Sequence, residues 1–324
     1  MPNPSRSDVH VNAPLTNISI AHVQDESKFV ASQVFPIVPV PKQSDLYFQY
    51  SQADFLRSGM QLRAPGTETV GAGYGLSTAS YSCNVFGLHK DVADQVRANA
   101  DAPLDMDKDA SKFLTQQFLI KRDADFAATH FQTNNTWTGS SAANGVDVTP
   151  SILWNAAGAN PIRDIEDELD SIEAKTGYRG NTVVMGVSAM AAFRNSADVV
   201  DRVKYTQKGV VTEDMLAGLL GVDRVVVARG IQNTAAQGAT ANYQRLFTAD
   251  AVLCCYTNPA PSLMSPSAGY TFVWSGFLGG GADGQRVSRF RMDNLRSDRI
   301  EIEAAYDQKL VSTSLGAMLK GVHS

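Results

Sequence analysis

The sequence predicts an α+β fold for this chain of 324 residues. Lys108 to Phe131 form the longest stretch with helical spacing of apolar residues. Residues 160 to 228 give helix and strand signals in turn, which is typical of a compact α/β unit. Arg296 to Val311 alternate apolar and polar side chains, as in a long strand with one solvated face.

Composition limits the class of protein. The chain is 44% hydrophobic and 19% charged, which is typical of a folded protein rather than a disordered one. Its formal net charge of -5 argues against a protein whose main task is to grip nucleic acid. Three cysteines do not make a disulfide framework, and no apolar leader or membrane span is visible. We therefore expect a soluble protein that is made and kept in a cytoplasm.

The N-terminal part, to about Glu26, is polar and rich in Pro and Asn, which predicts an extended arm. The apolar stretch from Phe29 to Pro41 carries prolines at positions 36, 39 and 41. Each proline removes a donor from a strand ladder, so this stretch is expected to be an edge strand or to lie along a surface.

A long hairpin is predicted next, with strands over Asp45 to Leu56 and Leu76 to His89. The run Gly71 to Gly75 between them is not a phosphate loop, because such a loop opens into a helix and none follows here. The glycines are therefore interpreted as the flexible end of the hairpin. An isolated hairpin is marginally stable in water, so its partner surface is expected on another subunit.

The helix over Lys108 to Phe131 comes after the hairpin and spans roughly 33 Å. Its predicted buried stripe consists of Phe113, Ile120, Ala124, Ala127 and Phe131, widened by Leu114 and Phe118.

The α/β unit begins where Asn160 and Pro161 start a helix that Gly177 ends. A strand over residues 181–187, a helix capped by Ser188, a helix from Thr212 to Gly221 and a strand from Arg224 to Ala228 are expected to follow. Further strands are predicted near residues 245–258 and 268–276. In the final long strand, one face carries Ile300, Ile302, Ala304 and Tyr306, and the other carries Glu301, Glu303 and Asp307.

No catalytic, cofactor-binding or metal-binding residues are predicted. The five histidines are scattered and none has the spacing of a metal pair. Cys254 and Cys255 point to opposite faces of a strand, so one thiol is expected in the core and the other half-exposed. The acidic run from Asp164 to Glu168 is interpreted as the solvated face of a helix near its N-terminus. The usual phosphate-loop and nucleophile-elbow motifs are absent from the sequence, so the chain is not expected to be an enzyme.

Several long stretches resemble the major capsid proteins of tailed phages, whose fold is the Hong Kong 97 type. The stretches are FPIVPVPKQSD, DFLRSGMQLRAPGTE, HKDVADQVRANADAPLD, DRVKYTQKGVVTEDMLAGLLGVDRVVVA and SPSAGYTFVWSG. They span most of the chain from Val34 to Gly276, and the order of the predicted elements matches as well.

The resemblance implies a division of the chain into five segments. These are an N-terminal arm (1–42), an extended loop formed by the hairpin (43–95), a peripheral domain with a spine helix (96–159), an axial domain (160–282) and a returning strand of the peripheral domain (283–324). The glycine run then lies near the tip of the extended loop.

The resemblance also implies a function. Such proteins assemble as pentamers and hexamers into an icosahedral virion shell around double-stranded DNA, in the cytoplasm of the host bacterium. The expected partners are further copies of the chain, a separate scaffolding protein and a portal, with no cofactor, no membrane and no sequence-specific DNA contact. The expected residues of contact between subunits are Arg57, Met60, Arg63, Glu68, Glu301 and Glu303.

One departure from some relatives is informative, because they crosslink their shells through a lysine on the extended loop. This chain has no lysine between Lys42 and Lys90, so we expect no such crosslink. An encapsulin-like shell that encloses enzyme cargo is the alternative function for the same fold.

Overall fold

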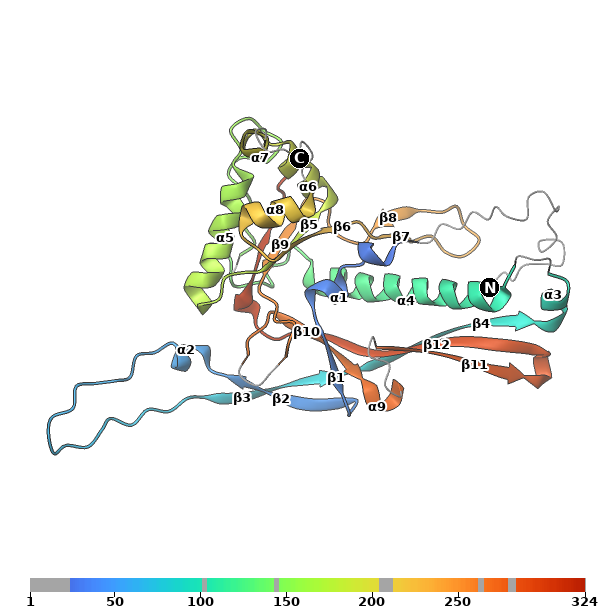
Figure 1. The fold of residues 1–324 in the computed structure, drawn as a ribbon, viewed down its shortest axis with the longest axis horizontal. Coiled ribbons are helices and arrows are strands. Elements are labelled where there is room, and N and C mark those ends of the chain that lie inside the picture. Colours follow the sequence, from blue (N-terminus) through green and yellow to red (C-terminus); the bar gives the residue numbers. More distant parts are fainter. Residues whose placement is uncertain are drawn as a thin grey trace.

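The computed structural model of the protein describes residues 24–100, 104–142, 146–203, 212–261, 265–278 and 284–323. A long sheet with one long helix lies beside a compact α/β unit, and a narrow loop projects from the sheet (Figure 1). The predicted α+β class is confirmed. Residues 1–23 of the predicted arm lie outside the described residues.

The long sheet has β12 (Ser297–Leu310) at its centre. Its other strands are β1 (Ile37–Val40), β10 (Gly269–Trp274), β11 (Gln285–Met292) and β4 (Asn84–Ala93). β12 pairs antiparallel with β10, β11 and β4. The predicted alternation along β12 is confirmed, since Ile300, Ile302, Ala304 and Tyr306 are buried and share a core with the long helix α4 (Met106–His130).

The segment that enters the long sheet is anchored in the core of its own chain. Pro39 lies in β1, which pairs with β10 at the edge of the sheet, as predicted. Before it, the short helix α1 (Ala31–Val34) is buried, and Phe29 and Phe35 on either side of it are almost inaccessible to solvent. The predicted arm is therefore fixed to its own subunit from Phe29 onward.

Helix α4 begins after Asp105, whose side chain accepts a hydrogen bond from the Lys108 backbone N–H. The predicted buried stripe is confirmed for Leu114, Phe118, Ala127 and Phe131. It is wrong for Phe113, which is 42% exposed and lies under the Lys90 ammonium, 5.6 Å from the ring centre. The buried face of α4 points toward the long sheet and α1. Segments that are distant in the sequence therefore decide which side of the helix is buried.

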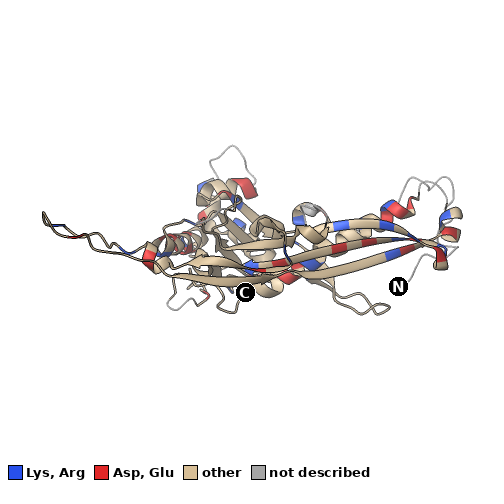
Figure 2. Cartoon of the chain, turned by 90° about the horizontal axis from the view of Figure 1, so that it is seen from below, with Lys and Arg blue, Asp and Glu red and all other residues tan. Residues whose placement is uncertain are grey.

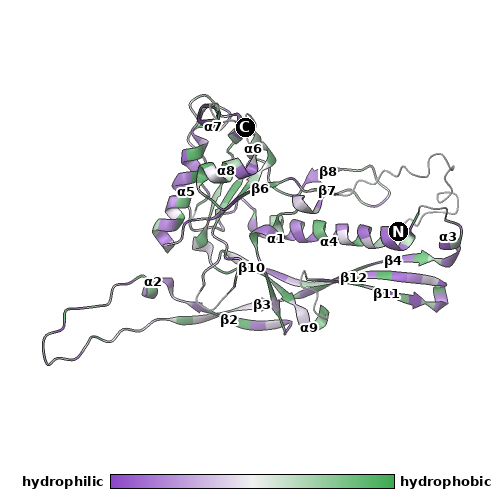
Figure 3. Cartoon of the chain, in the orientation of Figure 1, coloured by the Kyte–Doolittle hydropathy of each residue, from purple (hydrophilic) through white to green (hydrophobic). Residues whose placement is uncertain are grey.

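The α/β unit contains a four-stranded sheet in the order β13 (Gly316–Leu319), β9 (Val252–Cys255), β5 (Thr182–Gly186) and β6 (Arg224–Ala228). Around it lie α5 (Pro161–Thr176), α6 (Val187–Asn195), α7 (Ala197–Val203) and α8 (Glu213–Leu220). Figure 3 shows hydrophobic colouring on the strands of this sheet. These strands are almost entirely buried, as expected of a sheet covered on both faces.

The predicted helix ends of this unit are largely confirmed. Gly177 and Gly221 end α5 and α8 with positive φ values of 77° and 65°, and Thr212 caps α8 through the Met215 N–H. The cap predicted at Ser188 is wrong, because β5 runs directly into α6 and Gly186 is the N-cap.

Two strands belong to a different sheet from the one that chain order suggests. β10 lies within the predicted axial segment (160–282), yet it pairs with β12 of the long sheet. β13 lies in the predicted returning segment (283–324), yet it pairs with β9 of the α/β unit. The C-terminal part of the chain therefore connects the long sheet and the α/β unit.

The projecting part of the predicted extended loop (43–95) covers residues 44–82, which are called the extended loop from here on. It consists of β2 (Ser44–Tyr50), the single turn α2 (Gln52–Phe55), an irregular stretch and β3 (Leu76–Ser82). The first predicted strand ends early, at Tyr50, because α2 follows it. The second is divided at Cys83, since β3 pairs with β2 whereas β4 pairs with β12. The remaining elements are α3 (Asp94–Ala98), α9 (Ser275–Leu278) and the hairpin of β7 (Ile231–Asn233) and β8 (Tyr243–Arg245).

Candidate functional site

The extended loop concentrates the exposed apolar surface of the protein. Of the twenty most exposed large hydrophobic side chains in the described part of the chain, nine lie between residues 46 and 76. They are Leu46, Phe48, Phe55, Leu56, Met60, Leu62, Val70, Tyr74 and Leu76. Met60 is 95% and Leu62 102% exposed. Apolar patches of this kind on one element are typical of a protein–protein interface.

The neck of the extended loop, where residues 50–55 face residues 74–75, has a defined internal structure. Tyr50, Phe55 and Tyr74 form a cluster with ring centres 5.5–5.9 Å apart. The Gly75 N–H donates to the Asp54 carboxylate at 2.9 Å, and the Ser51 N–H donates to the Gly75 carbonyl at 3.0 Å. The glycine run was predicted near the tip, but Gly75 is fixed opposite Ser51 at the neck, so the run lies on the returning limb.

The residues predicted for contact between subunits on this loop are exposed. Arg57, Arg63 and Glu68 form no ion pair with any other described residue, and the Arg63 guanidinium donates to the Thr67 carbonyl within the same turn. Their charges are therefore available to another molecule.

The two predicted carboxylates of β12 lie on the face turned away from α4, but they are not equivalent. Glu303 already accepts a hydrogen bond from Arg286 of β11, at 3.1 Å from Nε. Glu301 forms no ion pair with a described residue and lies opposite His89 of β4. Glu303 is therefore already paired within its own subunit, whereas the predicted contact of both carboxylates with a neighbouring subunit stays a prediction.

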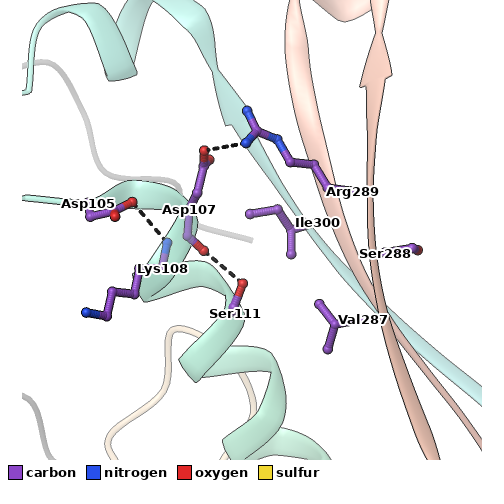
Figure 4. Close-up of a pocket in the computed structure, with 8 residues that line it drawn as sticks. All are labelled: Asp105, Asp107, Lys108, Ser111, Val287, Ser288, Arg289 and Ile300. Carbon is purple, nitrogen blue, oxygen red and sulfur yellow. Dashed lines mark hydrogen bonds and ion pairs between the residues drawn. The ribbon is translucent and has the colours of Figure 1, made fainter. Parts of the chain in front are cut away.

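A cluster of arginines and aspartates fixes the first turn of α4 to β11 and β12. Arg97 donates to Asp298 at 2.7 Å and to Asp107 at 2.6 Å, and Arg289 contacts the same two carboxylates. Figure 4 shows Asp107 facing Arg289 beside a pocket of about 400 Å³. Hydrogen bonds from Arg289 and Arg97 hold the pKa of Asp298 far below its usual range. No sequence motif indicated this cluster, because its members are up to 201 residues apart.

Two buried polar side chains of α4 were also missed from the sequence. Asp123 accepts hydrogen bonds from the backbone N–H groups of Val30 and Ala31, at 2.8 and 2.9 Å. Burial raises its pKa to about 6, although these two donors act in the opposite direction. Burial also lowers the pKa of His130 to about 4. Asp123 therefore holds the entry of α1 against the middle of the long helix.

Two predictions about polar groups in the α/β unit are wrong. Glu168 is buried rather than solvated, and it accepts hydrogen bonds from the backbone N–H and the hydroxyl of Ser141. Cys254 and Cys255 are both fully buried, and burial raises the pKa of the Cys255 thiol to about 12. The cysteine strand β9 is covered on both faces, so alternation along it does not produce an exposed side.

The part of the chain that the structure describes contains neither a metal-binding cluster nor a helix that could span a membrane. No group of three or more His, Cys, Asp or Glu side chains there is arranged to hold a metal ion. Among the described helices, none has the length and apolar character needed to cross a membrane.

Comparison with known proteins gives concordant matches. Residues 139–263 match the family described as Phage major capsid protein E. The major capsid protein of Burkholderia phage BcepMu is 25% identical over 68% of this chain and 69% of its own length. The major capsid protein of Pseudomonas phage JBD67 is 23% identical over 85% of this chain and 87% of its own length.

Solved structures share the fold at lower identity. A phage-related protein from Bordetella bronchiseptica RB50 superposes with a TM-score of 0.68 at 20% identity, over 92% of this chain and 94% of that one. The encapsulin SrpI of Synechococcus elongatus gives a TM-score of 0.57 at 12% identity, over 96% and 92%. The capsid of Cyanophage P-SCSP1u gives 0.58 at 10%, over 88% and 85%. The chain is therefore similar to the major capsid proteins of phages, and it shares its fold, the Hong Kong 97 type, with solved phage capsids and an encapsulin.

Proposed function

We propose that this chain assembles as pentamers and hexamers of itself into a closed icosahedral head shell around phage double-stranded DNA. The observation that carries the proposal is the exposed extended loop. Among the described strands, its two strands pair only with each other, and nine large apolar side chains on it are exposed in the single subunit. A two-stranded hairpin with exposed apolar residues gains stability when another copy of the chain covers it.

The charge distribution supports a wall that encloses DNA without gripping it. The formal net charge is -5, and Figure 2 shows basic and acidic residues interspersed along the strands of the long sheet. Tight basic contacts to phosphate at every subunit would add a strong, salt-dependent affinity. We therefore propose a structural role without enzymatic activity, in the capsid of the virion, after assembly in the host cytoplasm.

Within the shell, Arg57, Arg63 and Glu68 are proposed to pair with charges of a neighbouring subunit, and Glu301 of β12 is the carboxylate left free to receive an arginine. Met60 is proposed to pack against an apolar surface there. A separate scaffolding protein and a portal are proposed as further partners. The division into arm, loop, peripheral and axial segments remains part of this proposal.

Electron microscopy of the purified protein tests the proposal. Closed shells, tubes or capsomers are expected, and a persistent monomer at high concentration would overturn it. An enzyme-filled compartment is the alternative for the same fold, because an encapsulin shares it. The two curated relatives are named major capsid proteins, which favours the phage shell. Particles isolated from a producing host should contain nuclease-protected DNA rather than a protein cargo.

A further inference from the structure

The hairpin of β7 and β8 projects from the α/β unit as a sheet of two strands (Figure 1). Its Thr234 N–H donates to the Asn242 carbonyl at 2.9 Å, so these two residues are a hydrogen-bonded pair of the ladder. Along an antiparallel ladder, such pairs alternate with pairs whose N–H and C=O groups point away from the partner strand. The main-chain groups of Ile231 and Asn233 therefore point away from β8 and form the outer edge of β7.

Gln24 occupies the outward groups of Ile231 in the way that a neighbouring strand would. Its side-chain amide donates to the Ile231 carbonyl at 2.7 Å and accepts from the Ile231 N–H at 3.0 Å. The main chain of an added strand offers the same donor and acceptor to each outward residue of an edge. The segment that leads into α1 is therefore already bound to the edge of β7 at this point.

The next outward residue on the edge is Asn233, whose main-chain N–H and C=O have no partner in the described part of the chain. Its side chain is engaged within the hairpin, because the amide oxygen accepts from the N–H groups of Asn242 and Ala235 at 2.8 and 3.1 Å. These bonds fix the shape of the hairpin tip. An open strand edge is a template for a further strand, and a hairpin of two strands is only marginally stable without one.

We propose that residues 18–23 of the same chain add to the edge of β7 as a third strand. The chain after Gln24 turns away from the hairpin, because Val30 and Ala31 at the start of α1 bind Asp123 of α4. The residues before Gln24 are therefore the ones that can continue along the edge toward Asn233. Their tether at Ile231 gives them an effective concentration on the order of millimolar at this edge, which favours them over a separate molecule.

The composition of this segment fits a strand. Ile18, Ile20 and Val23 are β-branched, and Ser19 and Ala21 alternate with the two isoleucines. The sequence has no proline between Pro14 and Pro36, so every residue of the segment carries a main-chain donor. The third strand ties the N-terminal part of the chain to the α/β unit as well as to α4. The inference concerns the single subunit and does not depend on the formation of a shell.

Amide hydrogen exchange at Asn233 is the first test. In the wild-type protein this N–H is expected to be protected, although it points away from β8. The double variant Ile20→Pro/Ala21→Pro removes a donor from each side of the added strand, and it is expected to speed exchange at Asn233 by about tenfold or more. The control Val11→Pro/Asn12→Pro places two prolines before the segment and is expected to keep the wild-type rate. Fast exchange at Asn233 in the wild type, or equal rates in all three proteins, would overturn the inference.

The second test identifies the strand that occupies the edge. A benzophenone amino acid replaces Ile20 in an equal mixture of ¹⁵N-labelled and unlabelled protein that is assembled together. Mass spectrometry after irradiation is expected to find crosslinks to residues 231–235 in which both peptides carry the same label. The same replacement at Val11 is the control and is expected to give no crosslink to these residues. Pairs of mixed label would assign the edge to another copy and overturn the inference, as would the absence of any crosslink from position 20 to the hairpin.

Discussion

The side-chain amide of Gln52 donates a 2.7 Å hydrogen bond to the main-chain carbonyl of Lys175 and thereby joins the neck of the extended loop to the last turn of α5. The same side chain accepts a hydrogen bond from the Ser314 hydroxyl. These two bonds connect the loop to α5 and to the segment that precedes β13. Gln52 therefore helps to set the direction in which the loop leaves the subunit, together with the Gln49 amide, which donates to the Val311 carbonyl.

Replacement of this side chain should free the loop without unfolding the subunit. Gln52→Ala removes both bonds and is expected to lower the free energy of unfolding by about 1 kcal/mol in total, because each bond lies at an exposed position and contributes about 0.5 kcal/mol, the low end of the usual range. Amide hydrogen exchange in residues 44–82 should become faster, and the yield of particles should fall. The matched control is Gln61→Ala, at an exposed position of the same loop. Equal exchange rates in the two variants would contradict the role of Gln52.

Reversal of one loop charge should stop closure of the shell. Arg63→Glu is expected to give a folded subunit with an unchanged circular dichroism spectrum that no longer forms closed particles. Exposed pairs contribute only about 0.2–1 kcal/mol each, but the shell repeats the contact at every subunit. Arg245→Glu on the exposed strand β8 is the control and should assemble normally. Normal particles from Arg63→Glu, seen by electron microscopy, would contradict the role of Arg63 in closing the shell.

The wild-type shell should contain no covalent links between subunits. The chain has no lysine between Lys42 and Lys90, so residues 44–82 of the extended loop lack the amine needed for an isopeptide bond. Purified shells dissolved in denaturant should run as one monomer band on a gel. A ladder of larger bands that persists under reducing conditions would refute this expectation.

Asp123 should give the stability of the subunit a distinctive dependence on pH. Burial raises its pKa from 3.8 to about 6 in the folded protein, so the stability linked to this group is fully present below about pH 3.8 and is lost as pH rises through 6. Wild type should therefore lose up to about 3 kcal/mol relative to Asp123→Asn between pH 4 and pH 7.

The comparison between the two proteins is needed because His130 acts in the opposite direction. Its lowered pKa makes the folded state more stable as pH rises from about 4 to 6.5. His130 is present in both proteins, so its contribution cancels in the difference. Denaturant unfolding at pH 4, 5, 6 and 7 measures that difference, and a constant value across this range would show that Asp123 does not titrate there.

Local sequence determined the elements whose signals depend on a few neighbouring residues. Helix α5 begins at Pro161 and ends before Gly177 because proline and glycine act on their own turn of backbone. The alternation along β12 identified its buried face, because successive strand side chains point in opposite directions. The comparisons confirm the resemblance of long stretches to phage coat proteins, since they match a phage major capsid protein family and two phage major capsid proteins.

Only the tertiary structure decided which polar side chains are buried and which strands share a sheet. Glu168 lies in an acidic run that looks solvated, but Ser141 covers it. β10 and β13 each lie in a different sheet from the strand that precedes them in the chain. Arg97 binds Asp298, which is 201 residues away in the sequence. Periodicity states which side of an element is apolar, whereas burial of a charge depends on the distant segment that packs against it and supplies its hydrogen bonds.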